Sequence, residues 1–394
     1  MKTISGARAS LEATLSPAVP RVSPGVERSL AVDRLRGLAM VLMALDHLRL
    51  FMYPSFGTDL SDPDISPAYY ALRWISHPCA PAFVFLAGVS VWLYQRNHAA
   101  STTQLGRYLV TRGVWLILLE LTVVNLVWNL GWRGYWNLQV LWAIGWGMIA
   151  LALLVHCRLR TVGWIGVAIV AGHNALDAFH AADLGRIAPL WVLLHEPMWI
   201  RLEGGSGIHV QYPLLPWMGI MALGYAAAPV LLMPRAERHA LMLRIALAAL
   251  VVFLVLRYTN LYGDPRPWQP QDHGVVSTIM AFLNVEKYPP SMLFIFITLG
   301  LALLLLLALD RPEGRGEDGL CQFGRVPLFF YVVHLPLAQL GVWLYLHGAS
   351  ADRPLSAGNI DFLALFGLWG LLLFVLFFTC RAYEKAQMRR TAPA

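Results

Sequence analysis

The sequence contains few charged residues for its length: Asp, Glu, Lys and Arg make up 13% of its 394 residues. Soluble globular chains carry about 25%. Lysine is the scarcest of the four, because only three of the 30 basic residues are lysines, namely Lys2, Lys287 and Lys385. This composition excludes a disordered, coiled-coil or collagen-like chain. A water-exposed surface needs charged side chains, so their scarcity points to a polytopic membrane protein.

Cysteine is also scarce and scattered. Cys79, Cys157, Cys321 and Cys380 are the only four, and none forms a C-x-x-C pair or another zinc-finger spacing. This pattern excludes a disulfide framework of the kind that staples small secreted domains. We therefore expect four free thiols.

Apolar residues are abundant, at 58% of the chain, and they gather in long runs. A helix that spans a bilayer needs about 20 mostly apolar residues, and only helices and closed barrels satisfy their backbone groups in lipid. The sequence therefore predicts an all-α, polytopic integral membrane bundle of about ten helices. The predicted spans are 34–53, 74–94, 109–128, 138–156, 162–181, 212–232, 243–260, 290–309, 325–346 and 359–380.

The distribution of basic residues predicts the topology. With the N-terminus in the cytoplasm, 21 of the 30 basic residues fall on the cytoplasmic side, so both termini are expected there. The net charge of +7 then reflects arginines at membrane ends, and no nucleic-acid partner is expected. We expect a disordered cytoplasmic tail at 1–30, a transmembrane domain at 31–382 and a cytoplasmic C-terminal tail at 383–394.

One segment leaves the helix count open between ten and eleven. Residues 187–203 are apolar but contain His195, Glu196 and Arg201, which are costly at mid-bilayer. We favour a re-entrant or interfacial segment on the outer side.

The first predicted helix carries the strongest functional signal. Arg36 and His47 are 11 residues apart, which places them on one helix face about 16 Å apart along the axis. An arginine at the cytoplasmic end and a deep imidazole suit a long ligand with an anionic head and a reactive tail, such as acetyl-CoA. We expect Arg36, with Arg34, to bind its phosphates. Gly37 is expected to leave room for the ligand beside them.

The thioester would then meet His47. This imidazole would act as general base toward the acceptor, or as a nucleophile that carries the acetyl group. Asp46 or a neighbouring helix would orient it, although Asp46 points about 100° away. The structural alternative is that Asp33 with Arg36, and Asp46 with Arg49, are ordinary ion pairs along the helix.

The motif of Arg36, ten residues and His47, on a helix that opens Asp-x-x-Arg-Gly, resembles that of bacterial membrane acyltransferases that decorate polysaccharides. Further stretches resemble the bacterial relatives of heparan-α-glucosaminide N-acetyltransferase, and the resemblance covers about residues 30 to 340. They are His77-Pro-Cys-Ala-Pro-Ala-Phe-Val-Phe-Leu-Ala-Gly88, Tyr212-Pro-Leu-Leu-Pro-Trp217-Met-Gly, Lys287-Tyr-Pro-Pro-Ser291 and Gly324-Arg-Val-Pro-Leu-Phe-Phe-Tyr-Val-Val-His334.

This resemblance implies transfer of an acetyl group from cytoplasmic acetyl-CoA to an amine or hydroxyl of a sugar or glycan, in a bacterial inner membrane. The sequence departs from the lysosomal enzyme of the family, which has asparagine at the position of His47 and its proposed catalytic histidine in the following loop. Residues 54–73 of this chain contain no histidine. The match at His47 is instead to the polysaccharide acyltransferases.

Four further residues are candidates for the same site. His77 opens the second predicted helix and is expected to share a cavity with His47 as a second catalytic group, the alternative being an interfacial cap. Lys287, Arg49 and His334 are assigned to the acceptor. For Lys287 the alternative is an interfacial anchor.

His173, Asp177 and His180 are expected on one face of the fifth predicted helix. No fourth ligand accompanies them, so we expect them to line a cavity and expect no metal. The expected partners are the lipid bilayer, the acyl-CoA donor and a sugar or glycan acceptor, with a homodimer left open. The alternative function is a transporter for a polar solute, since buried His and Asp also mark proton pathways.

Overall fold

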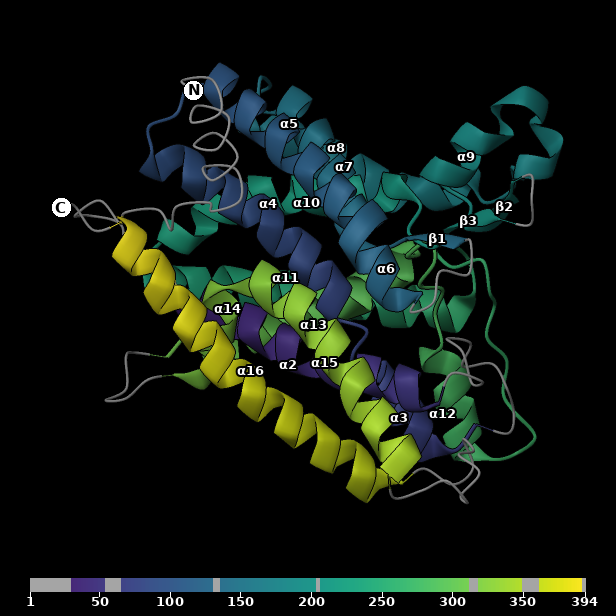
Figure 1. Ribbon diagram of the computed structural model, residues 1–394. Helices are drawn as coiled ribbons and strands as arrows, with labels where there is room; N and C mark the ends of the chain where they lie inside the picture. The colour runs from purple at the N-terminus through teal and green to yellow at the C-terminus, as the bar shows by residue number, and fades with distance from the viewer. Residues whose placement is uncertain are drawn as a thin grey trace.

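The structure, a computed structural model, describes residues 30–53, 65–129, 135–202, 206–311, 318–348 and 361–391. It is a bundle of helices with one small three-stranded sheet at one end (Figure 1). The predicted N-terminal tail at 1–30 lies outside the described residues except for Leu30. The four cysteines are free, as expected.

The helices follow the apolar runs of the sequence. All ten predicted spans contain a helix. The long helices are α2 (Leu30–Met52), α4 (Cys79–Asn97), α5 (Thr102–Leu119), α7 (Val140–Leu154), α8 (Leu159–Gly172), α10 (Leu214–Ala227), α11 (Arg235–Thr259), α13 (Met292–Leu309), α15 (Pro327–Gly348) and α16 (Phe362–Thr391). The short helices are α3 (Pro67–Trp74), α6 (Asn125–Trp128), α9 (Ala188–Leu194), α12 (Val275–Leu283) and α14 (Gly319–Arg325).

Seven helical stretches of the described residues are long and apolar enough to cross a membrane. The chain is therefore an integral, multi-pass membrane protein. Seven is fewer than the ten predicted spans, for two reasons. Helices α7 and α8 have only 15 and 14 residues, and α2, although 23 residues long, carries Asp33, Arg34, Arg36, Asp46 and Arg49.

Helix α2 tolerates these charges because other helices surround it. It packs against α4, α13, α14, α15 and α16. The contact with α14 is the tightest, since a Cβ at Gly37 would collide with the Leu320 carbonyl and one at Gly324 with the Asp33 carbonyl. Two glycines, one from each helix, thus let the two backbones touch.

The segment 187–203 does not span. It forms α9, whose seven residues extend only about 10 Å, followed by strand β2 (Met198–Arg201). Strand β3 (Gly207–Val210) lies in the middle of the sheet, parallel to β1 (Tyr135–Leu138) and antiparallel to β2. The sheet and α9 lie at the same end of the bundle as α6 (Figure 1). Because β1 runs into α7 and β3 into α10, the sheet fixes the residues at these two junctions.

Two helix ends differ from the prediction. The predicted span 162–181 ends as an α-helix at Gly172 and continues as a 3-10 turn at His173–Leu176. Helix α16 continues through most of the predicted C-terminal tail, to Thr391.

Candidate functional site

A buried cluster of charged side chains lies at the C-terminal end of α2. The Asp46 carboxylate accepts hydrogen bonds from Arg49 at 2.9 Å and from Arg73, on α3, at 2.7 Å. The Arg49 guanidinium also donates to the Tyr69 hydroxyl and lies over its ring. Arg49 and Arg73 are almost fully buried. One carboxylate therefore pairs with two buried arginines, which leaves an excess positive charge, and ties α2 to α3.

His47, next to Asp46 in sequence, points to another helix. Its Nδ1 lies 2.7 Å from Nε2 of His334 on α15, whose Nδ1 lies 3.1 Å from the Phe330 carbonyl. A carbonyl can only accept, so Nδ1 of His334 carries its proton and its Nε2 accepts. His47 therefore donates from Nδ1, and Nε2 of the neutral ring is left as the basic nitrogen. Trp128 meets the His47 ring edge to face.

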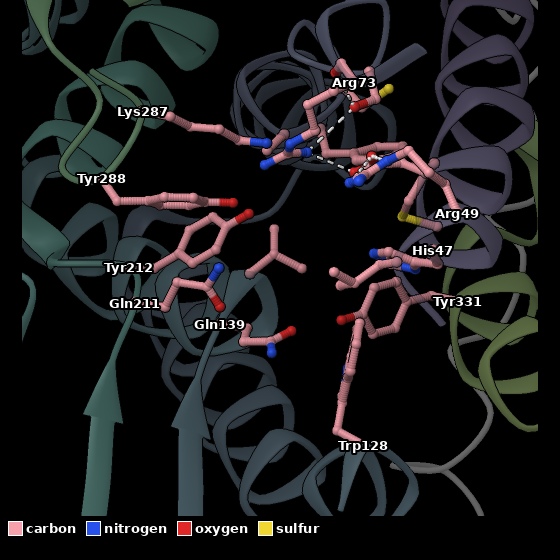
Figure 2. Close-up of a pocket in the computed structure, with 18 residues that line it drawn as sticks. His47, Arg49, Arg73, Trp128, Gln139, Gln211, Tyr212, Lys287, Tyr288 and Tyr331 are labelled. Carbon is pink, nitrogen blue, oxygen red and sulfur yellow. Dashed lines mark hydrogen bonds and ion pairs between the residues drawn. The ribbon is translucent and has the colours of Figure 1, made fainter. Parts of the chain in front are cut away.

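A cavity of about 100 Å³ opens beside His47, with room for a small polar group. Seven segments of the chain contribute residues to its wall. Figure 2 shows how the labelled residues surround it. Tyr212 and Tyr288 face it from one side, and His47 and Tyr331 from the other (Figure 2). Its polar lining residues are Asp46, His47, Arg49, Arg73, Ser76, Gln139, Gln211, Tyr212, Lys287, Tyr288 and Tyr331.

The cavity is electropositive. Arg49, Arg73 and Lys287 face a single lining carboxylate, that of Asp46. Burial and the Arg73 guanidinium lower the pKa of the Lys287 ammonium. Within the described residues, the buried Nε of Arg73 has no hydrogen-bond partner. Such a site suits a ligand that is anionic or that develops negative charge during a reaction.

Hydrogen bonds to Asp264 hold the turn that carries Lys287. The Asp264 carboxylate accepts from the Ser291 hydroxyl at 2.7 Å and from the Glu286 amide at 2.8 Å, one on each side of Lys287. Ser291 also caps α13 by accepting from the Phe294 amide. These hydrogen bonds thus fix the turn that carries Lys287, just before the N-terminus of α13.

Comparison with known proteins identifies the family. The family described as heparan-alpha-glucosaminide N-acetyltransferase, catalytic, matches residues 28–259, more than half of the chain. The chain belongs to this family. No curated protein matches it significantly. The resemblance noted in the sequence is therefore confirmed: this is a membrane protein of an acetyltransferase family that uses acetyl-CoA.

The match to the heparan-alpha-glucosaminide N-acetyltransferase family includes part of the cavity. His47, Arg73, Gln139 and Tyr212 lie within residues 28–259, whereas Lys287 and His334 lie beyond them.

Several residues assigned from the sequence meet in this cavity. Asp46, His47, Arg49 and Lys287 all line it. His334 is not among its lining residues and instead accepts the hydrogen bond from His47. The partner of His47 therefore comes from a neighbouring helix, one of the two arrangements expected, while Asp46 is engaged by two arginines.

His77 is not among the residues that line the cavity. It is buried between Trp74 and Phe294, with ring centroids 6.2 Å and 5.5 Å away. The His77 ring thus packs against aromatic side chains beside the cavity residues Ser76 and Cys79, and its role as a second catalytic group stays a prediction.

The residues assigned to the phosphates form contacts between helices. Arg36 donates to Asp33 at 3.1 Å, to the Gly324 carbonyl at 3.1 Å and to Ser90 at 2.9 Å. Arg34 donates to Asp318 and to the carbonyls of Leu309, the last residue of α13, and Arg311. The room expected beside Gly37 is filled by α14, so that assignment was wrong. A role of the two arginines in binding coenzyme A stays a prediction.

Sequence reasoning missed Arg73, Gln139, Gln211 and Tyr331 as cavity residues. Gln139 and Gln211 stand one residue beyond the ends of β1 and β3, and these strands were not predicted. Tyr331 had a signal, its position three residues before His334. Arg73 entered the topology prediction only as a basic residue on the outer side. Its position just before the apolar segment of α4 was the signal that could have identified it as a cavity residue.

The carboxylate of Asp46 should be essential for stability. We expect Asp46→Asn to lower the free energy of unfolding by about 3 kcal/mol, because it leaves two buried guanidinium groups without their counter-charge. The measurement is thermal unfolding in detergent, read as a lower melting temperature. The matched control is Glu384→Gln, whose carboxylate pairs at 3.5 Å with the more exposed Arg325 and should cost less than about 1 kcal/mol. Equal losses in the two variants would contradict this account.

Proposed function

We propose that this chain transfers the acetyl group of acetyl-CoA to an amine or hydroxyl of a sugar or glycan, with His47 as the general base. The observation that carries the proposal is the hydrogen-bond relay from His47 through His334 to the Phe330 carbonyl. This relay leaves a lone pair on Nε2 of His47 at an electropositive cavity. Family membership supports the acetyl donor, and the family name supports an amino sugar as the first acceptor to examine.

The proposed step is a direct transfer. The acceptor nitrogen or oxygen attacks the thioester carbonyl carbon while Nε2 of His47 takes its proton. The new bond to the acceptor forms and the carbon–sulfur bond breaks, so coenzyme A leaves as a thiolate that recovers the proton from the imidazolium. Arg73 and Lys287 are the cations available to stabilise the oxyanion of the tetrahedral intermediate.

The position of His47 on α2 supports access for the donor. Arg36 and His47 lie on one continuous helix, about 16 Å apart along its axis. We propose that the donor reaches His47 from the cytoplasmic end, where the basic residues gather, and that the protein works in a bacterial inner membrane.

His47→Ala should reduce acetyl transfer from labelled acetyl-CoA to glucosamine at least about 100-fold, because the general base is lost. His334→Leu should also reduce kcat, since His47 loses the acceptor that fixes its tautomer, whereas His334→Gln, which keeps an acceptor oxygen, should restore part of it. The control is His98→Ala, at an exposed position at the end of α4.

A His47→Ala enzyme with normal activity would refute the assignment. Labelled acetyl-CoA given without acceptor tests the alternative in which His47 carries the acetyl group. Direct transfer predicts no labelled protein, and label that depends on His47 would establish the covalent route.

The donor-binding role of Arg36 can be separated from its ion pair. Arg36→Gln should weaken acetyl-CoA binding at least about tenfold if the guanidinium contacts a phosphate. Asp33→Asn removes the ion-pair partner but keeps the Arg36 charge, so it should leave binding unchanged or stronger. Isothermal titration of both purified variants measures this, and an equal weakening in both would reduce Arg36 to a structural role.

A further inference from the structure

A second polar cluster lies at the sheet end of the bundle. His173 and Asp177 follow the end of α8, and His195 follows α9. One ligand atom from each of the three side chains lies within 4.8 Å of the other two. The Nε2 of His195 is 3.0 Å from Oδ1 of Asp177. Segments 18 residues apart in sequence thus converge on one point.

The two imidazoles are buried with unsatisfied nitrogens. His173 is 2% exposed and His195 is 3% exposed. Among the residues that the structure describes, neither ring nitrogen of His173 nor Nδ1 of His195 has a hydrogen-bond partner. Each buried polar atom left without a partner costs about 1–3 kcal/mol. A cation bound beside Asp177 would satisfy one of the two unpartnered nitrogens of His173.

We propose that His173, Asp177 and His195 bind a divalent transition-metal ion, with zinc the best fit. Zinc takes imidazole nitrogen at about 2.0–2.1 Å and carboxylate oxygen at about 2.0–2.2 Å, which sets its ligand atoms about 3.4 Å apart in a tetrahedral site. The Nε2 of His195 and Oδ1 of Asp177, 3.0 Å apart, are close to this spacing, and all three ligand atoms lie within 4.8 Å of one another. Two imidazoles and one carboxylate form a donor set for zinc, and water would complete the four positions.

A neighbouring amide orients the carboxylate as metal sites require. Asn174 donates from Nδ2 to Oδ2 of Asp177 at 2.8 Å, which directs Oδ1 toward the histidines. The Oδ1 of Asn174 in turn accepts from the Met292 amide of α13 at 2.8 Å. Such outer hydrogen bonds commonly fix metal-binding carboxylates.

The ligand set differs from the one considered in the sequence. His180 lies outside the cluster, because α8 ends at Gly172 and turns the following chain away. Its side chain is 63% exposed, and its Nδ1 lies 3.9 Å from Glu196. The third ligand of the proposed site is therefore His195. The expectation of no metal rested on the lack of a fourth ligand, and in the proposed site water would take that position.

The proposed metal has a structural role that is independent of the proposed acetyl transfer. It would join the end of α8 to the segment that holds α9 and β2. Strand β2 pairs with β3, and β3 runs directly into Gln211 and Tyr212 of the cavity. The ion would thereby secure the sheet whose strands β1 and β3 lead into the cavity residues Gln139 and Gln211.

The test is metal content of the full-length protein purified in detergent without chelators. We expect about one zinc per chain by mass spectrometry of the elements. Depletion by chelation should lower the melting temperature, and titration with zinc chloride should restore it. Asp177→Asn, which keeps the size of the side chain, should weaken zinc binding 10- to 100-fold. The matched control is His180→Gln, which should bind zinc as the unsubstituted protein does.

Two results would overturn the site. One is a metal-depleted protein that takes up no zinc on titration, and the other is an unchanged zinc affinity in Asp177→Asn. If that variant does not fold, cobalt substitution of the unsubstituted protein decides the question. Tetrahedral coordination by nitrogen and oxygen gives an intense ligand-field absorption band, and its absence would refute the proposal.

Discussion

The Asp46 carboxylate is the interaction on which the arrangement of the site depends. It binds Arg49 on its own helix and Arg73 on α3, and Arg49 also holds Tyr69. These bonds fix the far end of α2 against the segment that leads into α4. Because Asp46 and His47 are consecutive on a helix, their side chains diverge by about 100°. Anchoring Asp46 toward α3 therefore turns His47 toward α15, where His334 accepts its proton.

The central position of α2 makes this charged site compatible with a membrane protein. Charges in a lipid-facing helix are costly, and they persist where they face the interior of a bundle and have partners. Five helices cover α2, and its contact with α14 is close enough that Gly37 and Gly324 admit no side chain. At the C-terminal end of α2, three cations and one carboxylate are likewise buried within the bundle, around the cavity beside His47.

Much of the fold and part of the site could be predicted from the sequence. The apolar runs located all ten long helices, and the rarity of charge in those runs pointed to Asp46, His47, Arg49 and Lys287, which do line one cavity. The contacts between distant segments could not be read from helical periodicity. His334 is the hydrogen-bond partner of His47, and His77 packs against Trp74 and Phe294. Both contacts are set by how the helices pack against one another. The short sheet that brings in Gln139 and Gln211 has too weak a pattern to stand out beside long helices.

The central claim is that the acetyl group is transferred in the cavity at His47. The most direct measurement is a cryo-electron microscopy structure of the detergent-purified protein with a non-hydrolysable acetyl-CoA analogue. The account predicts the acetyl carbonyl in this cavity, within about 4 Å of Nε2 of His47 and facing Arg73 or Lys287. An analogue bound with its acetyl end outside the cavity would contradict the account.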